Sequence, residues 1–203
     1  MVSVTAIVPL KALDLAKQRL AGRLTAGERR TLMTDAFLHV VDACLATPAI
    51  RDVIAVVGDD AGVALAATRP VTVMREPGGG LNRAVAHATG AVPPREASLV
   101  VVADLPELTR DDLTALVALL RPHPDRQVLV APTHDGGTGA LLRRPAAVIA
   151  PAFGSASATA HLSAAQAAGV RAGMIWRPGM ARDVDRPADL DRYAGRVPSS
   201  RDL

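Results

Sequence analysis

The chain has 203 residues, of which 49% are hydrophobic and 21% charged, a balance typical of a soluble globular domain and not of a disordered or fibrous protein. The net charge of +3 and the sequence pI of about 9.7 suit an anionic ligand, but scattered arginines and 2% aromatic residues argue against a nucleic-acid surface, which needs a basic stripe and stacking platforms. No apolar run approaches the ~20 residues that a membrane span requires.

The start of the chain enters an apolar run directly, without the basic region and cleavage site of a signal peptide, and this indicates a cytoplasmic protein. The single Cys44 lies in an apolar helical pattern, so we expect a buried thiol and no intramolecular disulfide. The five histidines show neither metal-ligand spacing nor a nucleophile partner, and we expect structural or surface roles for them.

Short β-branched apolar runs alternate with segments of helical period, which predicts a three-layer α/β fold with a mostly parallel sheet and helices on both faces. The expected strands lie near residues 3–9, 52–58, 71–75, 98–104, 127–132 and 171–177. No repeat or long linker divides the chain. We therefore expect one domain over residues 1–196 and a flexible tail over 197–203.

The helix starts carry capping patterns. Residues 25–28 (Thr-Ala-Gly-Glu) form a capping box ahead of an apolar helical face that ends before Pro48. Residues 109–112 (Thr-Arg-Asp-Asp) form a second box, and Asp59 with Asp60 can cap a short helix. These positions fix where three of the helices begin.

The loop after the first strand carries three cations, Lys11, Lys17 and Arg19. Among 23 basic side chains, the two lysines both fall in this loop. Ligands of parallel α/β sheets bind at the carboxyl ends of strands, and a nucleoside triphosphate needs neutralisation before another anion can approach its α-phosphorus. The loop is therefore a candidate triphosphate site, with a solvated amphipathic turn as the alternative.

Three glycines precede a helix in residues 75–84, where backbone can approach a ligand closely. We expect Gly79, Gly80 and the following Asn82 to contact the nucleotide. The segment is neither a Walker A loop nor a Rossmann fingerprint, so an ordinary glycine turn remains an alternative.

The fourth apolar strand ends at Asp104, which predicts a carboxylate facing the ligand crevice. Such an acid can hold Mg²⁺, which usually takes one or two protein carboxylates, although an Asp that caps the turn would look the same.

Late in the chain, Asp183 and Asp185 flank Val184, and in an extended segment both acids share one face while the valine packs inward. Two like charges so placed repel unless a cation joins them. Neutralisation by Arg182 and Arg186, or a place for Asp185 at a helix N-terminus, are the alternatives. Small-residue loops at 134–142 and 153–157 can offer amides and hydroxyls to an anion.

These motifs together, in this order, resemble those of the CofC/FbiD guanylyltransferases, from the first strand to about Tyr193. The segments that carry the resemblance are Pro9-Leu10-Lys11, Ala16-Lys17-Gln18-Arg19-Leu20, Pro77-Gly78-Gly79-Gly80-Leu81-Asn82, Ala103-Asp104-Leu105-Pro106, Gly137-Thr138, Phe153-Gly154 and Asp183-Val184-Asp185.

The resemblance implies a nucleotide-diphospho-sugar transferase (GT-A-like) fold and a Mg²⁺-dependent guanylyl transfer from GTP to a phosphorylated three-carbon acid, in the biosynthesis of deazaflavin coenzyme F420. In the bacterial branch the acid is phosphoenolpyruvate. The residues that it assigns are Asp104, Asp183 and Asp185 for two Mg²⁺ ions, Thr138, Gly154 and Ser157 for the phosphoacid, and Lys11, Lys17 and Arg19 for the triphosphate.

The sequence departs from the family pattern at Gln18, Gly139 and Ala156, and the last two touch the proposed acid pocket. The alternative functions are a guanylyltransferase with 2-phospho-L-lactate or 3-phosphoglycerate as acceptor, a molybdopterin- or sugar-phosphate nucleotidyltransferase, and a catalytically silent nucleotide-binding regulator. For assembly, the expected oligomer is a homodimer.

Overall fold

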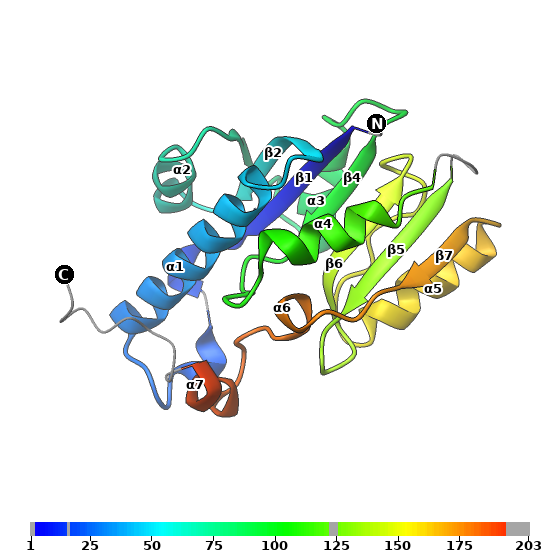
Figure 1. Ribbon diagram of the computed structural model, residues 1–203. Coiled ribbons are helices and arrows are strands. Elements are labelled where there is room, and N and C mark those ends of the chain that lie inside the picture. Colours follow the sequence, from blue (N-terminus) through cyan, green and yellow to red (C-terminus); the bar gives the residue numbers. More distant parts are fainter. Residues whose placement is uncertain (1–2, 16, 122–125, 194–203) are drawn as a thin grey trace.

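The computed structural model describes residues 3–15, 17–121 and 126–193, so the tail predicted at 197–203 lies outside the described residues. Seven strands form one sheet in the order β3-β2-β1-β4-β6-β5-β7 (Figure 1). The strands are β1 (Val4–Leu10), β2 (Ile50–Val57), β3 (Thr72–Arg75), β4 (Ala97–Val101), β5 (Gln127–Pro132), β6 (Thr138–Arg144) and β7 (Arg171–Met174).

The helices lie on both faces of this sheet. They are α1 (Ala26–Leu45), α2 (Asp60–Ala66), α3 (Leu81–Thr89), α4 (Arg110–Ala118), α5 (Ser157–Ala167), α6 (Pro178–Ala181) and α7 (Pro187–Tyr193), with two short 3₁₀ helices, η1 (Leu13–Leu15) and η2 (Gln18–Leu20). Helices α1 and α4 cover one face, around Phe37 and Leu116. Helices α3 and α5 cover the other, around Val85 and Ala165. The predicted three-layer α/β architecture is confirmed.

Strand β6 is the one strand of the sheet that the sequence did not predict. It runs antiparallel to β4 and β5, whereas the other pairings are parallel. Most of this strand falls in the segment 134–142, for which glycines and other small residues predict a loop. Burial overrides this composition: Arg143 is 1% exposed and donates to the Ile149 carbonyl and the Thr89 hydroxyl.

The predicted helix starts are confirmed. Thr25 and Thr109 each form a complete capping box at the N-terminus of α1 and α4. Asp59 caps α2 by accepting from the Gly62 amide at 2.7 Å. Cys44 is fully buried, and burial raises the pKa of its thiol to about 12. No helix among the described residues is both long and apolar enough to cross a bilayer.

Gly139 in β6 allows the segment that contains α6 to pass close to this strand. A Cβ atom built there would lie 1.9 Å from the Met180 carbonyl oxygen, which is far inside any allowed contact. The backbone of α6 therefore lies directly against β6. This close packing directs residues 182–186 toward the carboxyl end of β4. Gly139, which departs from the family pattern, is therefore required for the packing of α6 against β6.

Candidate active site

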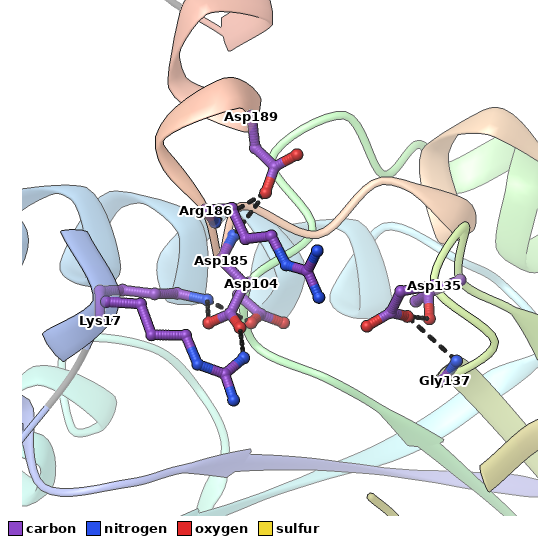
Figure 2. Close-up of polar contacts among 9 residues, drawn as sticks. Lys17, Asp104, Asp135, Gly137, Asp185, Arg186 and Asp189 are labelled. Atoms are coloured by element: carbon purple, nitrogen blue, oxygen red, sulfur yellow. Dashed lines mark hydrogen bonds and ion pairs between the residues drawn. The ribbon is translucent and has the colours of Figure 1, made fainter. Parts of the chain in front are cut away.

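Two loops and the returning late segment meet beyond the carboxyl ends of β1 and β4. The Lys17 ammonium lies 2.5 Å from Asp104 Oδ2 and 3.7 Å from Asp185 Oδ1 (Figure 2). Arg19 forms a second ion pair with Asp185. Residues separated by up to 168 positions in sequence thus form one charged cluster, as the sequence predicted for the lysine loop, Asp104 and Asp185.

The cluster is fixed by the backbone around it. Val184 is buried, as predicted, and its amide donates to the Asp104 carbonyl oxygen at 3.3 Å. Lys17 adopts a left-handed backbone conformation with φ of 53°, which is uncommon for a residue with a side chain and recurs at functional sites. Its side chain is only 6% exposed. Asp59 anchors the lysine loop, because its second oxygen accepts from the Leu13 amide at 2.8 Å.

Asp189 is a residue that sequence reasoning missed. Its carboxylate accepts from the amides of Asp185 and Arg186 at 3.1 and 2.7 Å, at the start of α7 (Figure 2). Asp189 therefore does the capping that was an alternative role for Asp185, whose carboxylate faces Lys17 and Arg19 instead. Its position two residues after the Pro that opens the helix is the pattern that could have indicated this.

Asp183 has a different environment from Asp185. Burial, the neighbouring Asp104 and then Asp135 raise the pKa of the Asp183 carboxyl to about 6, and the field of Lys17 opposes them. Within the described residues Asp183 has no ion-pair partner, and Arg182, the cation next to it, pairs with Glu107 at 3.0 Å. The alternative in which flanking arginines neutralise both acids is thus not what the structure shows.

The three predicted metal ligands are not assembled as a triad. In the described part of the chain, no group of three or more His, Cys, Asp or Glu side chains is placed to hold one metal ion. The reason is the Lys17 ammonium, which stands between Asp104 and Asp185 and relieves their repulsion. Asp104 and Asp183 still fit Mg²⁺ as hard oxygen donors, because the charge of Asp104 raises the pKa of Asp183 and two carboxylates are enough for this ion. Mg²⁺ binding stays a prediction.

A cleft of about 620 Å³ runs along the carboxyl ends of the parallel strands, beside this cluster. The predicted nucleotide-binding residues that line it are Lys11, Lys17, Arg19 and Gly80. Gly79 is exposed next to them. Asn82 points elsewhere: its side-chain amide donates to the Phe153 carbonyl at 3.0 Å and accepts from the Phe153 amide at 2.6 Å. Asn82 thus ties α3 to the 151–156 loop.

A smaller hollow of about 300 Å³ adjoins the cleft and shares Asp185 with it. Asp135 and Arg186 also line the hollow, and the Arg186 side chain extends between the acid cluster and Asp135 (Figure 2). The Thr133 hydroxyl, the Gly137 amide and Arg186 lower the pKa of Asp135, in that order of effect. Asp135 is a further acid near the site that was read only as part of a loop.

Thr138 and Ser157, predicted to contact the phosphoacid, are brought together in a buried network. The Ser157 hydroxyl donates to Thr138 Oγ1 at 2.9 Å, and Thr138 Oγ1 lies 3.2 Å from His161 Nδ1. His161 Nε2 accepts from the Ala152 amide at 2.9 Å. Burial, with Arg143 nearby, lowers the pKa of His161 to about 4, so the ring is neutral.

Gly154, the third predicted contact, is exposed with φ of +142° in the loop before α5. The buried hydroxyls therefore hold the loop that carries Gly154 in place. The expected structural role of His161 agrees with this geometry.

Comparison with known proteins shows the relationships of the chain. The family profile "Guanylyl transferase CofC like" matches residues 4–193. A phosphoenolpyruvate guanylyltransferase from Sphaerobacter thermophilus is 40% identical over 95% of this chain and 93% of that protein. The protein of the same name from Roseiflexus sp. RS-1 is 36% identical over 91% of this chain and 82% of its own length.

Solved structures show the fold. A nucleotide-diphospho-sugar transferase homologue from Desulfovibrio desulfuricans G20 matches with a TM-score of 0.75 at 14% identity, over 97% of this chain and 89% of its own. A 4-diphosphocytidyl-2C-methyl-D-erythritol synthase matches with a TM-score of 0.64 at 17% identity, over 95% and 97%. The nucleotide-diphospho-sugar transferase fold predicted from the sequence is confirmed.

Proposed function

Because the chain belongs to the family of CofC-like guanylyl transferases, we propose that it joins GMP from GTP to phosphoenolpyruvate. The products are enolpyruvyl-2-diphospho-5'-guanosine and pyrophosphate, and the reaction serves the cytoplasmic biosynthesis of deazaflavin coenzyme F420. The relatives that carry the name phosphoenolpyruvate guanylyltransferase support the choice of acceptor.

The observation that carries the proposal is the position of Lys17 between Asp104 and Asp185, at the border of two hollows. A transfer between two phosphate compounds brings two anions together, so the site must cancel their repulsion and hold them in line. The cleft suits the triphosphate, because Lys11, Lys17 and Arg19 line it.

The basic side chains of the first loop neutralise the triphosphate in this mechanism. Lys11 and Arg19 line the cleft on its exposed side, while the buried Lys17 faces the reacting end beside Asp104. A phosphate oxygen of the acid attacks the α-phosphorus, the α–β phosphoanhydride bond breaks, and pyrophosphate leaves. The attacking phosphate monoester has a second pKa of about 6 and is already ionised at neutral pH, so no general base is required.

Asp104 and Asp183 would hold Mg²⁺, with Asp185 positioning Lys17 and Arg19 next to them. When bound, Mg²⁺ supplies positive charge to phosphate oxygens of both substrates. The 151–157 loop, held by the Thr138–Ser157–His161 network and by Asn82, presents Gly154 and its neighbours to the acid.

The proposal is tested by pyrophosphate release with GTP and Mg²⁺, comparing phosphoenolpyruvate, 2-phospho-L-lactate and 3-phosphoglycerate as acceptors. CTP and ATP replace GTP in parallel reactions. We expect the highest kcat/KM for the pair GTP and phosphoenolpyruvate. A preference for CTP or ATP, or for another acid, would contradict the proposal, and each result names the substrate that replaces the one proposed.

A further inference from the structure

Glu76 is an uncompensated carboxylate in the wall of the nucleotide cleft. It follows β3 directly, is half-buried, and its backbone amide donates to the Val57 carbonyl at 3.0 Å. Within the described residues its side chain accepts no hydrogen bond and forms no ion pair. The adjacent cation, Arg75, pairs with Asp60 instead. A carboxylate without a cationic partner among the described residues would repel a triphosphate in this cleft, so its presence there indicates another role.

Gly58 leaves room for the Glu76 carboxylate. A Cβ atom at Gly58 would lie 3.3 Å from Glu76 Oε1 and 2.7 Å from the Ala12 amide nitrogen. The absence of a side chain there lets the carboxylate and the lysine loop approach each other over the end of β2. The Glu76 carboxylate therefore lies over the end of β2, in the wall of the cleft.

Glu76 lies at the end of the cleft that is remote from the reacting phosphorus. The sheet order places β2 and β1 between β3 and β4, so three strand spacings, roughly 14 Å, separate the ends of β3 and β4. Lys17 and Arg19 pair with Asp104 and Asp185 at the β4 side, whereas the backbone of Lys11 lies near Gly58 and Glu76. A carboxylate repels phosphates and accepts hydrogen bonds, so at the β3 side it favours the part of a nucleotide that donates hydrogen bonds.

The surroundings of Glu76 suit a flat, partly apolar ring. Leu81, at the start of α3, is 41% exposed and lines the same cleft, as do Gly80 and Ala84. Binding sites for small molecules combine such apolar walls with a few placed polar groups. A nucleobase presents both features at once: a flat face and a polar edge.

We propose that the Glu76 carboxylate selects guanine, by accepting hydrogen bonds from its N1–H and its exocyclic amino group together. An ionised carboxylate is acceptor-only and binds two adjacent donors at once. Adenine and cytosine each place a ring acceptor next to the amino group, and uracil has one N–H between two carbonyls, so only guanine offers the matching pair. This assignment rests on the proposed function, because it takes GTP as the donor.

The test changes the hydrogen-bonding groups of the side chain at position 76 and of the nucleobase together. Xanthine carries a carbonyl where guanine carries the amino group, so a glutamine at position 76 matches xanthine with one acceptor and one donor. For Glu76→Gln we expect kcat/KM for GTP to fall at least about 100-fold, because charge-assisted hydrogen bonds are lost. In the same variant, kcat/KM for XTP should exceed kcat/KM for GTP. For the unaltered enzyme, ITP, which lacks the amino group, should be at least about 10-fold poorer than GTP.

Glu96→Gln is the matched control, since Glu96 precedes β4 and pairs with Arg51 at the amino ends of the strands, opposite the cleft. It should keep the preference for GTP. If the unaltered enzyme uses GTP, but ITP serves equally well or Glu76→Gln slows all nucleotides equally, the guanine assignment is wrong and the proposed function stands. If the unaltered enzyme prefers CTP or ATP, both fail. The ITP comparison needs no variant and is independent of any folding defect.

Discussion

Replacing Gly139 with alanine tests whether the crossing of the chain over β6 positions the acids. The new methyl carbon would lie 1.9 Å from the Met180 carbonyl oxygen, and atoms closer than 3.0 Å must separate, so the backbone of α6 has to retreat by about 1 Å. Overpacking of this kind typically destabilises a protein by about 1–3 kcal/mol. Because Asp183 and Asp185 follow α6 directly, a 1 Å displacement should lower kcat by about 100-fold.

Gly27→Ala is the control, since a Cβ atom there meets nothing within 4 Å in the exposed first turn of α1. It should leave kcat unchanged and raise stability by up to about 1 kcal/mol. Urea denaturation followed by circular dichroism gives the free energies of unfolding, and pyrophosphate release gives kcat. An alanine at position 139 that unfolds like the original protein and turns over at its rate would refute the reasoning.

Three further predictions concern the acid cluster and the buried network. Asp104→Asn should lower kcat about 100-fold or more without changing the unfolding midpoint, and near-normal turnover would contradict its role. Lys17→Gln should lower kcat/KM for GTP by a similar factor and raise the affinity of the nucleotide-free protein for Mn²⁺, measured by titration calorimetry; an unchanged affinity would show that Lys17 does not compete for these carboxylates. His161 has its pKa lowered from 6.5 to about 4, so the unfolded chain binds the extra proton between these values; the stabilisation is complete above pH 6.5 and about 3 kcal/mol of it is lost by pH 4. His161→Gln should show a correspondingly shallower loss in urea titrations between pH 7 and 4.5, and an identical pH slope would refute the buried neutral ring.

Local patterns predicted those parts of the fold that local physics decides. The capping boxes at Thr25 and Thr109 could be read directly, because a cap involves residues only three apart. Strand β6 could not, because it depends on partners β4 and β5 that lie far away in sequence and because its buried Arg143 finds acceptors on α3 and in the 145–150 loop.

The candidate site also contains features that local patterns predict and features that depend on long-range contacts. The rule that ligands bind at the carboxyl ends of parallel strands was enough to bring Lys17, Asp104 and Asp185 together. The sequence did not show that an ammonium would separate the last two, since this depends on the left-handed backbone at Lys17. The amide of Asn82 was assigned to the nucleotide, yet it binds the backbone of Phe153, a contact across 71 residues.

The ion pair between Lys17 and Asp185 joins the loop after β1 to the segment between α6 and α7, and Arg23 adds a second link, to Asp191 in α7, at 2.8 Å. During synthesis the sheet can start to form as soon as β1, β2 and β4 have left the ribosome. The charged cluster cannot form at that stage, because Asp185 follows α6, far beyond β4 in the sequence. A chain truncated before Asp185 would therefore lack one carboxylate of the cluster and should not consume nucleotide.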